Sequence, residues 1–443
     1  MLPGMCRRKP SMKRVLVIAY YWPPSGGSGV QRWVKFCKYL PAEGWEPVVF
    51  APLHADYPAL DPTMGADLPA SLEVLRGRIW EPYAAYRKLL GGKGASTQVT
   101  EISSGKKTWK QRLSLWIRAN LFVPDPRVGW VKPSVKTLKA YLREHPVDAI
   151  VTTGPPHSVH LIGQKLHKAT GLPWIPDFRD PWTRMYYLKY LPMTSCTWAR
   201  LRRQEQAVLD ECQTVLSCTP LVQEEFAAQT RTPVACITNG FDEEDFEGPA
   251  PEPDGHFNIT HTGLFAADGN PLTLWKVLGK MAASVPGFRE ALRIRLVGKV
   301  DREVLDALAD AGLAANVVAL GPCKHADAVA EQRAASLLIL PLRNDPEYRP
   351  ILPGKLFEYL AARRPVLGIG QEDGAMARVL TETEAGVTAG WENAASMQAF
   401  LTTAWQQHRE GGVPATAGDI GPYTRRSTTH ALAQLLDKIT RHE

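Results

Sequence analysis

The feature that most constrains the fold of this chain is an alternation of strand and helix patterns that occurs twice along its length. In the first half, an apolar run near residues 14–20 precedes a glycine-rich loop at 23–29, a helical pattern at about 30–41 and another apolar run at 46–51. This alternation is typical of a parallel sheet covered by helices on both faces. We therefore predict the α/β class for both halves. Strands of the second half are predicted near residues 257–262, 293–297, 317–320, 337–341 and 366–369.

A segment rich in proline and acidic residues separates the two halves. With 443 residues, the chain is long enough for two domains that each bury a core of their own. Residues 247–256 read EGPAPEPDGH, a composition typical of a linker. We therefore predict a first domain over residues 12–246, a linker over 247–256 and a second domain over 257–420.

Charge is distributed unevenly along the chain. The whole sequence has a net charge of +7, whereas residues 1–150 contain 23 Lys and Arg against 11 Asp and Glu, a balance of +12. A basic first half favours an anionic partner for that domain. No helix-turn-helix, zinc-finger or aromatic RNA-binding pattern is present, so we predict no nucleic-acid partner. An anionic membrane surface that carries a lipid-phosphate acceptor fits the charge better.

Cysteine usage and hydropathy indicate a cytoplasmic location. The seven cysteines form no Cys-x-x-Cys pair and no His/Cys ligand spacing, which predicts reduced thiols and no metal site. No apolar run approaches the length needed to span a bilayer. Residues 1–11 include Arg7, Arg8 and Lys9 without an apolar core and are not a secretion signal. Met12 could be the true start, because the first strand follows it directly.

The segment 109–122 (WKQRLSLWIRANLF) has an amphipathic helical pattern. Trp109, Leu113, Trp116 and Leu121 are predicted toward one side, with basic residues on the flanks. Such a helix could lie on an anionic membrane surface. In the alternative, its apolar side packs against the sheet of its own domain, as most amphipathic helices do.

Residues 353–366 (PGKLFEYLAARRPV) contain the strongest candidate for a ligand site. Gly354 lets an anion approach a predicted helix start, where free N–H groups and the helix dipole favour a phosphate. Lys355 adds a mobile positive charge, and Glu358 lies three residues further on the same helical face. These groups could hold the diphosphate and the ribose of a nucleotide. The alternative is an ordinary amphipathic helix whose Lys and Glu are merely solvated.

Five segments together resemble the retaining glycosyltransferases of the family 4 type, in the same order along the chain. The resemblance extends over residues 13 to 440 and is greatest to the bacterial branch that builds surface polysaccharides. It implies the GT-B architecture, in which two Rossmann-like domains face each other across a cleft. The segments are 20–40 (YYWPPSGGSGVQRWVKFCKYL), 177–183 (DFRDPWT), 239–242 (NGFD), 261–263 (HTG) and 353–366.

The resemblance also implies a function. It predicts an enzyme that moves a sugar, with retention, from a nucleotide-sugar donor to a glycan or lipid-linked acceptor, at the inner face of the cell membrane and without a cofactor. The C-terminal segment 421–443, with a helix at about 427–440, is expected to cross back to the first domain. Gly263, Gly354, Lys355 and Glu358 are the implied donor-binding residues.

The chain departs from the family pattern at the sugar-binding position. Many relatives carry two glutamates eight positions apart, of which the first touches the donor sugar. Glu358 matches the second glutamate, but Pro350 stands at the position of the first. Glu347 or the backbone of Ile351 and Leu352 could take over the sugar contacts.

A second departure concerns the charge that balances the diphosphate. Relatives often place an arginine or lysine after the strand that opens the second domain, whereas residues 263–271 here read GLFAADGNP. We therefore expect Lys299, Arg343 or Lys355 to balance the diphosphate. If none does, activity is impaired.

In the first half, the glycine-rich loop is the first candidate for a ligand contact. Gly26, Gly27 and Gly29 follow a strand and open a helix, a setting in which backbone can approach a phosphate or sugar. The spacing is not the dinucleotide fingerprint, so we disfavour NAD. The resemblance implies that this loop meets the donor diphosphate or the acceptor. The alternative is an ordinary flexible loop.

Two residues that follow later strands of the first half are the catalytic candidates. His157 could hydrogen-bond the transferred sugar or share charge in the transition state, with His160 as the alternative. Asp180 is expected at the carboxyl edge of the sheet, where open α/β sheets bind ligands. Both histidines could instead be structural, and part of the polar cluster of Asp177, Arg179 and Asp180 could be an internal salt bridge with Asp177 as a helix cap.

Two other functions are compatible with the same fold. One is a nucleotide-sugar epimerase, which would need no acceptor. The other is a degenerate member that only binds nucleotide or acts as a scaffold, which Pro350 and the absent basic residue near Gly269 would favour.

Overall fold

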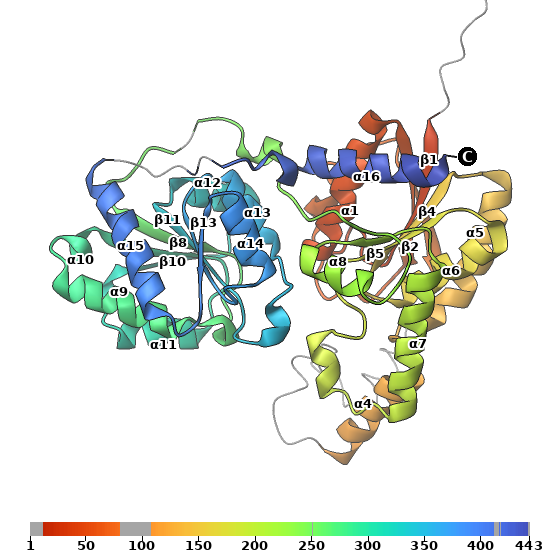
Figure 1. The fold of residues 1–443 in the computed structure, drawn as a ribbon, viewed down its shortest axis with the longest axis horizontal. Coiled ribbons are helices and arrows are strands. Elements are labelled where there is room, and N and C mark those ends of the chain that lie inside the picture. Colours follow the sequence, from red (N-terminus) through yellow and green to blue (C-terminus); the bar gives the residue numbers. More distant parts are fainter. Residues whose placement is uncertain (1–11, 80–107, 250, 412–415, 417, 442–443) are drawn as a thin grey trace, which may run out of the picture. The chain divides into compact units, whose positions relative to one another are not determined.

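A computed structural model of the chain describes residues 12–79, 108–249, 251–411, 416 and 418–441. The residues group into two compact units (Figure 1). The first unit comprises Met1–Thr238 with Thr429–Glu443, and the second comprises Asn239–Thr428. The predicted linker 247–256 lies within the second unit. Residues 1–11, for which we predicted no secretion signal, lie outside the described part of the chain.

The first unit is built on a seven-stranded sheet in the order β3-β2-β1-β4-β5-β6-β7. Every pair of neighbouring strands is parallel, as the strand-helix alternation predicts. The strands are β1 (Lys13–Ala19), β2 (Trp45–Leu53), β3 (Glu73–Arg78), β4 (Ala149–Gly154), β5 (Trp174–Phe178), β6 (Val215–Ser217) and β7 (Val234–Cys236). The helices are α1 (Ser28–Tyr39), α4 (Trp109–Leu121), α5 (Val131–Glu144), α6 (Ser158–Thr170), α7 (Ser195–Glu211), α8 (Pro220–Ala227) and α16 (Arg425–Thr440).

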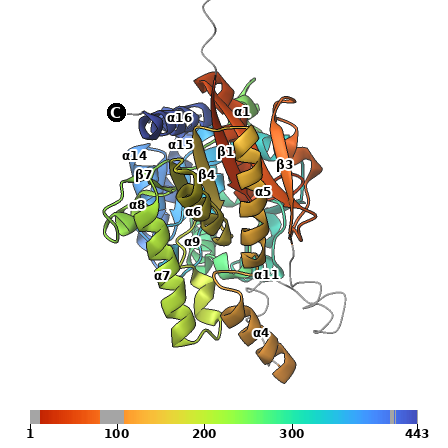
Figure 2. The ribbon, with the colours of Figure 1, turned by 90° about the vertical axis from the view of Figure 1, so that its right-hand side faces the viewer.

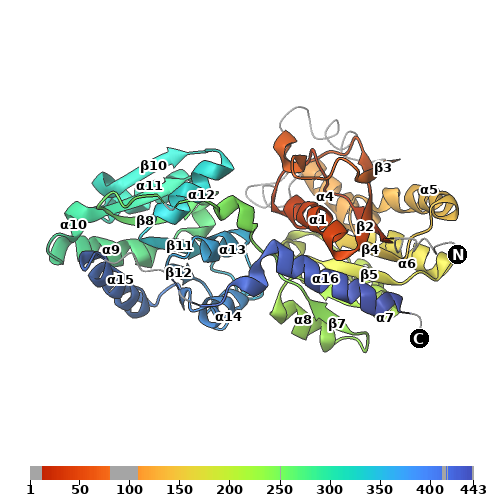
Figure 3. The same cartoon turned by 90° about the horizontal axis from the view of Figure 1, so that it is seen from above.

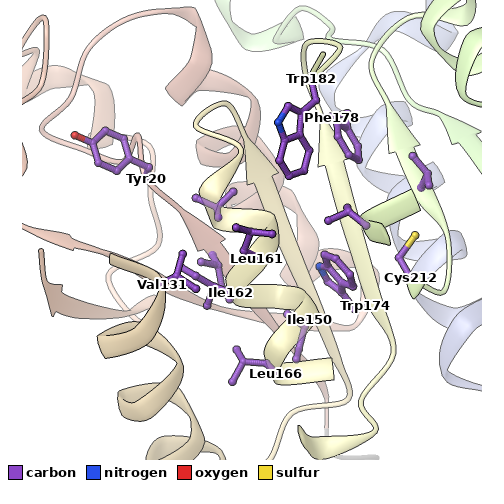
Figure 4. Close-up of a cluster of buried hydrophobic side chains, with 14 of the residues drawn as sticks. Tyr20, Val131, Ile150, Leu161, Ile162, Leu166, Trp174, Phe178, Trp182 and Cys212 are labelled. Carbon is purple, nitrogen blue, oxygen red and sulfur yellow. The ribbon is translucent and has the colours of Figure 1, made fainter. Parts of the chain in front are cut away.

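Both faces of this sheet are buried, because alternate side chains of a strand point to opposite sides. Leu16 and Ile18 of β1 belong to the core cluster on the face that α5 and α6 cover (Figure 2). Figure 4 shows part of that cluster, in which Ile150 and Trp174 of the strands lie against Leu161 of α6. Val15 and Val17 belong instead to the cluster on the opposite face.

The C-terminal helix α16 packs on that opposite face, as the resemblance implies. Its Leu432 and Leu436 are fully buried in the same cluster as residues of α1, and α16 runs alongside α1 in Figure 3. Asp437 accepts a hydrogen bond from Lys13 Nζ at 2.8 Å and one from Trp45 Nε1 at 3.2 Å. The last helix therefore joins the two ends of the chain in one unit.

The second unit repeats the architecture with a six-stranded parallel sheet in the order β10-β9-β8-β11-β12-β13. Its strands are β8 (Phe257–Thr262), β9 (Leu292–Val297), β10 (Val317–Gly321), β11 (Leu337–Pro341), β12 (Val366–Ile369) and β13 (Gly386–Ala389). Its helices are α9 (Leu272–Ser284), α10 (Phe288–Ala291), α11 (Arg302–Asp310), α12 (His325–Ala334), α13 (Gly354–Ala361), α14 (Ala375–Glu382) and α15 (Ala394–Arg409). The five strands predicted in this half are all present, and β13 was not predicted.

Helix α4 confirms the helical pattern of segment 109–122, but its apolar side does not pack inside the unit. Trp109, Leu113, Trp116 and Leu121 are 69%, 47%, 42% and 62% exposed. The alternative in which this side packs on its own sheet is therefore wrong for these four side chains. In the part of the chain that the structure describes, no helix combines the length and apolar character needed to cross a membrane.

Candidate functional site

The predicted donor-binding residues of the second unit lie at the carboxyl edge of its sheet. Gly263 directly follows the central strand β8, and its N–H donates to Val297 O at the end of β9 at 2.6 Å. Gly298 has φ of +117°, and a Cβ there would lie 2.5 Å from Gly263 O. Only glycine tolerates both this backbone conformation and this approach. The two loops can therefore lie in direct contact.

Lys355, at the start of α13, lies directly over the loop that follows β8. Gly263 has φ of +90°, and a Cβ there would lie 2.8 Å from Lys355 Cε. The Lys355 ammonium donates to Leu264 O and to His261 Nε2, each at 3.2 Å. The structure thus brings together Gly263 and Lys355, which are 92 positions apart in the sequence.

The environment of Lys355 lowers the pKa of its ammonium group. Burial lowers the pKa of Lys355 to about 8, and the nearby Glu358 carboxylate acts in the opposite direction. Burial and the lysine charge lower the pKa of His261 to about 3, so this imidazole is neutral. Its Nδ1–H donates to Ile339 O at 3.1 Å, which leaves Nε2 as the acceptor for Lys355. An arriving diphosphate would stabilise the charged form of the lysine.

The start of α13 has the features of an anion-binding helix end. Pro353 precedes the helix and provides no side-chain cap for the first N–H groups. A Cβ added at Gly354 would meet nothing within 4 Å, so the space beside this helix start is open. The N-terminal dipole and Lys355 therefore provide positive charge at the same place.

Glu358 lies one turn into α13, and Gln332 of α12 holds it in position. The Gln332 amide donates to Glu358 Oε2 at 2.9 Å and to Thr262 Oγ1 at 3.1 Å. Tyr359 also contacts the end of β8, because its hydroxyl accepts the Thr262 N–H at 2.9 Å. Gln332 and Tyr359 are fully buried, and sequence reasoning missed both roles. The only indication of these roles in the sequence was a polar group on the buried face of a helix.

Arg343 reaches the loop that lacks a basic residue. It follows β11, and its guanidinium pairs with Asp268 of segment 263–271 at 2.8 Å. This carboxylate offsets part of its charge, so Lys355 is better placed to balance a diphosphate. Lys299 also lies at this edge, where its carbonyl oxygen accepts the Phe265 N–H at 2.8 Å.

Pro350, Ile351 and Leu352, for which the resemblance predicted a place near the sugar, lie between β11 and α13. The Ile351 N–H donates to Tyr348 O at 3.0 Å, so that donor is already used. Leu352 is buried, whereas Glu347 is exposed. The part that any of these groups plays in sugar binding stays a prediction.

In the first unit, the candidate residues follow three neighbouring strands, and Arg179 ties their loops together. Its guanidinium donates to Gly29 O at 2.7 Å, to Gly154 O at 3.1 Å and to Pro155 O at 2.5 Å. A Cβ at Gly29 would lie 2.3 Å from Arg179 Nη1, so the glycine makes this contact possible. Arg179 therefore sets the positions of the loops after β1 and β4.

Asp177 is a core residue rather than a helix cap. It is fully buried and pairs with the buried Arg32 at 3.2 Å, and it accepts a hydrogen bond from Trp33 Nε1 at 2.7 Å. Arg32 also donates to Ile237 O and Thr238 O. The helix-cap prediction for Asp177 is therefore wrong, and its ionic partner Arg32 lies outside the predicted cluster.

His157 lies at the carboxyl end of β4, before α6, and is 4% exposed. Burial, His160 and Arg179 hold the pKa of His157 well below its usual value, so its ring is neutral. The ring stacks on the indole ring of Trp182, and the two ring centroids are 5.0 Å apart. His160 donates to or accepts from Thr152 Oγ1 at 2.9 Å, and burial lowers its pKa to about 3, which suits a structural role.

Asp180 lies at the end of the adjacent strand β5 and is half-buried. Burial raises its pKa, and the positive charge of Arg179 opposes that effect. In the glycine-rich loop, the Gly26 N–H donates to Ala59 O, and Gly27 has φ of +100° before α1. The carboxyl edge of β1, β4 and β5 thus gathers the four predicted residues of this unit.

Comparison with known protein families finds a match within the second unit. Residues 265–406 match the family described as Glycosyl transferases group 1. The second unit carries a glycosyltransferase group 1 domain. The match covers less than half of the chain and includes α13 with Lys355 and Glu358. No curated protein sequence matches the chain. Within the described residues, no group of three or more His, Cys, Asp or Glu side chains could hold a metal ion.

Solved structures extend the likeness over the whole chain. Sucrose-phosphate synthase from Thermosynechococcus elongatus matches 97% of this chain and 96% of its own, with 14% identity and a TM-score of 0.56. The trehalose-6-phosphate phosphatase N-terminal domain of Candida albicans matches 99% and 100%, with 12% identity and a TM-score of 0.61. WaaG, a glycosyltransferase involved in lipopolysaccharide biosynthesis, matches 96% and 95%, with 13% identity and a TM-score of 0.51. At these identities the likeness shows the fold, which is GT-B.

Proposed function

We propose that this protein is a hexosyltransferase that moves a sugar from a nucleotide-sugar donor to a glycan or lipid-linked acceptor in bacterial surface-polysaccharide synthesis. The observation that carries the proposal is the position of the Lys355 ammonium, 3.2 Å from Leu264 O and above Gly263, at the open start of α13. A cation, a helix N-terminus and a close backbone loop are what a diphosphate needs.

These groups would act on the leaving group of the reaction. Cleavage of the sugar–diphosphate bond leaves negative charge on the departing phosphate. Lys355 and the amides at the start of α13 can stabilise that charge as it develops, without a metal ion. Glu358, which Gln332 holds in position, would accept hydrogen bonds from the ribose hydroxyls. Gly354 keeps the helix start open for the phosphates.

Retention of configuration rests on the resemblance alone. On the same ground we propose attack on the same face of the sugar with help from the departing phosphate. In the first unit, the neutral ring of His157 can donate a hydrogen bond to a sugar hydroxyl or accept one from it. Asp180, with its raised pKa, is the candidate that faces the acceptor hydroxyl.

A position at the cytoplasmic face of the membrane is part of the proposal. The first unit exposes Trp109, Leu113 and Trp116 on α4, and the first 150 residues have an excess of positive charge. Tryptophan and basic residues both favour the surface of an anionic bilayer. The lipopolysaccharide role of WaaG is a property of that protein, but it supports the same kind of acceptor here.

The donor proposal is tested by thermal shift with UDP, GDP, ADP and their sugars. We expect one nucleotide series to raise the melting temperature, because a ligand that binds only the folded state stabilises it. Lys355→Gln should lose most of the shift, whereas Lys276→Gln, the same change at an exposed position of α9, should retain it. The absence of any shift with every nucleotide, in a folded protein, would refute the donor site.

The reaction is tested by nucleoside-diphosphate release from the nucleotide sugar that binds. We expect release to require an added lipid or glycan acceptor. Turnover of the sugar without any acceptor would favour the epimerase instead. Flotation with liposomes tests the membrane proposal: binding should increase with anionic lipid and fall in Trp116→Ser, and equal recovery with neutral and anionic liposomes contradicts it.

A further inference from the structure

The first unit contains a pocket that the donor site does not explain. It has a volume of about 350 Å³, a size found in sites for small ligands. Its residues come from the loops after β1, β2, β4 and β5, from the end of α4 and the loop that follows it, from the segment before α7 and from α7 itself. Two of the candidate functional features, His157 and helix α4, therefore meet in one cavity.

Two side chains of the pocket lining have polar atoms without partners. His157 is 4% exposed and Trp182 is 1% exposed, and both line the pocket. Neither ring nitrogen of His157 nor Trp182 Nε1 has a hydrogen-bond partner in the described part of the protein. Buried polar atoms are nearly always paired, and each unpaired one calls for an explanation. A hydroxyl-bearing ligand beside His157 and Trp182 would satisfy them.

Much of the remaining lining of the pocket is apolar. Phe122, Leu188, Leu191, Met193 and Leu201 line it. Such a surface gains free energy when a hydrocarbon chain displaces water from it. Two arginines and two aspartates also line the pocket, so opposite charges balance there and an isolated anion is not favoured.

Apolar surface continues from the pocket to the outside of the unit along α4. Ala119 of α4 and Phe122 just after it line the pocket, whereas Leu113, Trp116 and Leu121 of the same segment are exposed. Asn120 holds the helix in this place, because its Oδ1 accepts a hydrogen bond from the N–H of Thr194, just before α7, at 2.9 Å. Figures 1 and 2 both show α4 beside the start of α7. Clustered exposed apolar side chains mark a contact with an apolar partner.

We propose that this pocket binds the part of a lipid-linked acceptor where its hydrocarbon chain joins its head group. The chain lies along Leu188, Leu191 and Met193 and leaves toward the exposed side of α4, which rests on the membrane. A hydroxyl of the head group lies at His157. This inference rests on the proposed glycosyltransferase function and narrows its acceptor class from any glycan to an amphipathic one.

Calorimetry with alkyl glycosides tests the inference. Octyl β-glucoside and methyl β-glucoside share a head group and differ only in chain length, and both are used below the concentration at which micelles form. Each buried methylene contributes about 0.8 kcal/mol, so burial of two or three gives an affinity for the octyl compound on the order of 10- to 100-fold higher. Equal binding of the two compounds would show that the pocket recognises only the sugar and would overturn the proposal.

Variants decide whether the chain binds inside this pocket. Met193→Trp narrows it, and Ala119→Leu is a milder change of the same kind if the first variant unfolds. Both should abolish the preference for the octyl compound. Leu113→Ser removes apolar surface outside the pocket and should keep that preference. A preference that survives Met193→Trp and Ala119→Leu, or that is lost in Leu113→Ser, places the chain elsewhere and overturns the proposal.

A thermal shift with UDP, GDP and ADP on the same samples separates the two proposals. If a nucleotide binds and the chain-length preference is absent, the acceptor inference alone fails. If the preference is present and no nucleotide binds, the glycosyltransferase function fails and the pocket is not an acceptor site.

Discussion

The pH dependence of nucleotide binding follows from the position of Lys355. Burial lowers the pKa of Lys355 to about 8, so the side chain loses its proton just above neutral pH. A bound diphosphate interacts with the charged form only. Nucleotide affinity should therefore fall as the pH rises through 8, whereas an ordinary lysine with a pKa of 10.5 would leave it unchanged in this range.

The size of the effect can be worked out from that pKa. At pH 7 about 90% of a group with a pKa near 8 is charged, and at pH 9 about 10% is charged. The affinity for a nucleoside diphosphate should consequently fall about tenfold between these two pH values. Lys355→Gln keeps a hydrogen-bond donor for Leu264 O but removes the charge. Loss of a charged hydrogen bond costs about 1.5–3 kcal/mol, or roughly 10- to 150-fold in affinity at pH 7.

Calorimetric titration of UDP, GDP or ADP at pH 7, 8 and 9 measures both quantities. The wild type should show the tenfold decline and Lys355→Gln should be nearly flat. If both proteins change in parallel with pH, another group is responsible and the assignment of Lys355 is refuted. The free energy of unfolding gives an independent check, because it should change with pH in the opposite direction to the affinity. Between pH 8 and 10.5 Lys355 is protonated in the unfolded chain but not in the folded protein, so the free energy of unfolding should rise over this range.

Three further predictions concern the two units separately. Glu358→Ala should weaken nucleoside-diphosphate binding by about 1–2 kcal/mol and leave inorganic pyrophosphate binding unchanged, and equal losses in calorimetry would contradict its ribose role. Asp177→Asn leaves the charge of Arg32 buried without its partner and should lower the free energy of unfolding in urea by about 3–5 kcal/mol; a loss below about 1 kcal/mol would refute it. Gly263→Ala should lose about 1–3 kcal/mol of stability and also nucleotide affinity, whereas Gly287→Ala, which is strained but meets no neighbour, should lose stability alone.

Much of the architecture could be predicted because its signals are local. Apolar runs bounded by glycine and proline mark strands such as β1 and β12, and the start of α13 is marked by Pro353 and Gly354. The strand β13 was missed, since Gly386–Ala389 is short and has only one fully buried side chain. The helical character of α4 was also predictable, but its exposure was not, because the same amphipathic pattern serves a core helix and a surface helix.

The contacts that build the two sites depend on long-range packing. Lys355 meets Gly263, and Arg179 meets Gly29, across distances in the sequence that no local pattern reports. The pairing of Asp177 with Arg32 shows the same limit, since its sequence neighbours suggested only a local cluster with Asp177 as a helix cap.

What the sequence determined by itself is the order of strands and helices and the residues that follow each strand, because periodicity and turn chemistry act over a few residues. What only the tertiary structure decided is which of those residues share a site, how deeply Lys355 and His157 are buried, and where apolar side chains stay exposed. Burial and side-chain contacts arise when distant elements pack, so the protonation of these groups and the pocket beside α4 appear only in the folded chain.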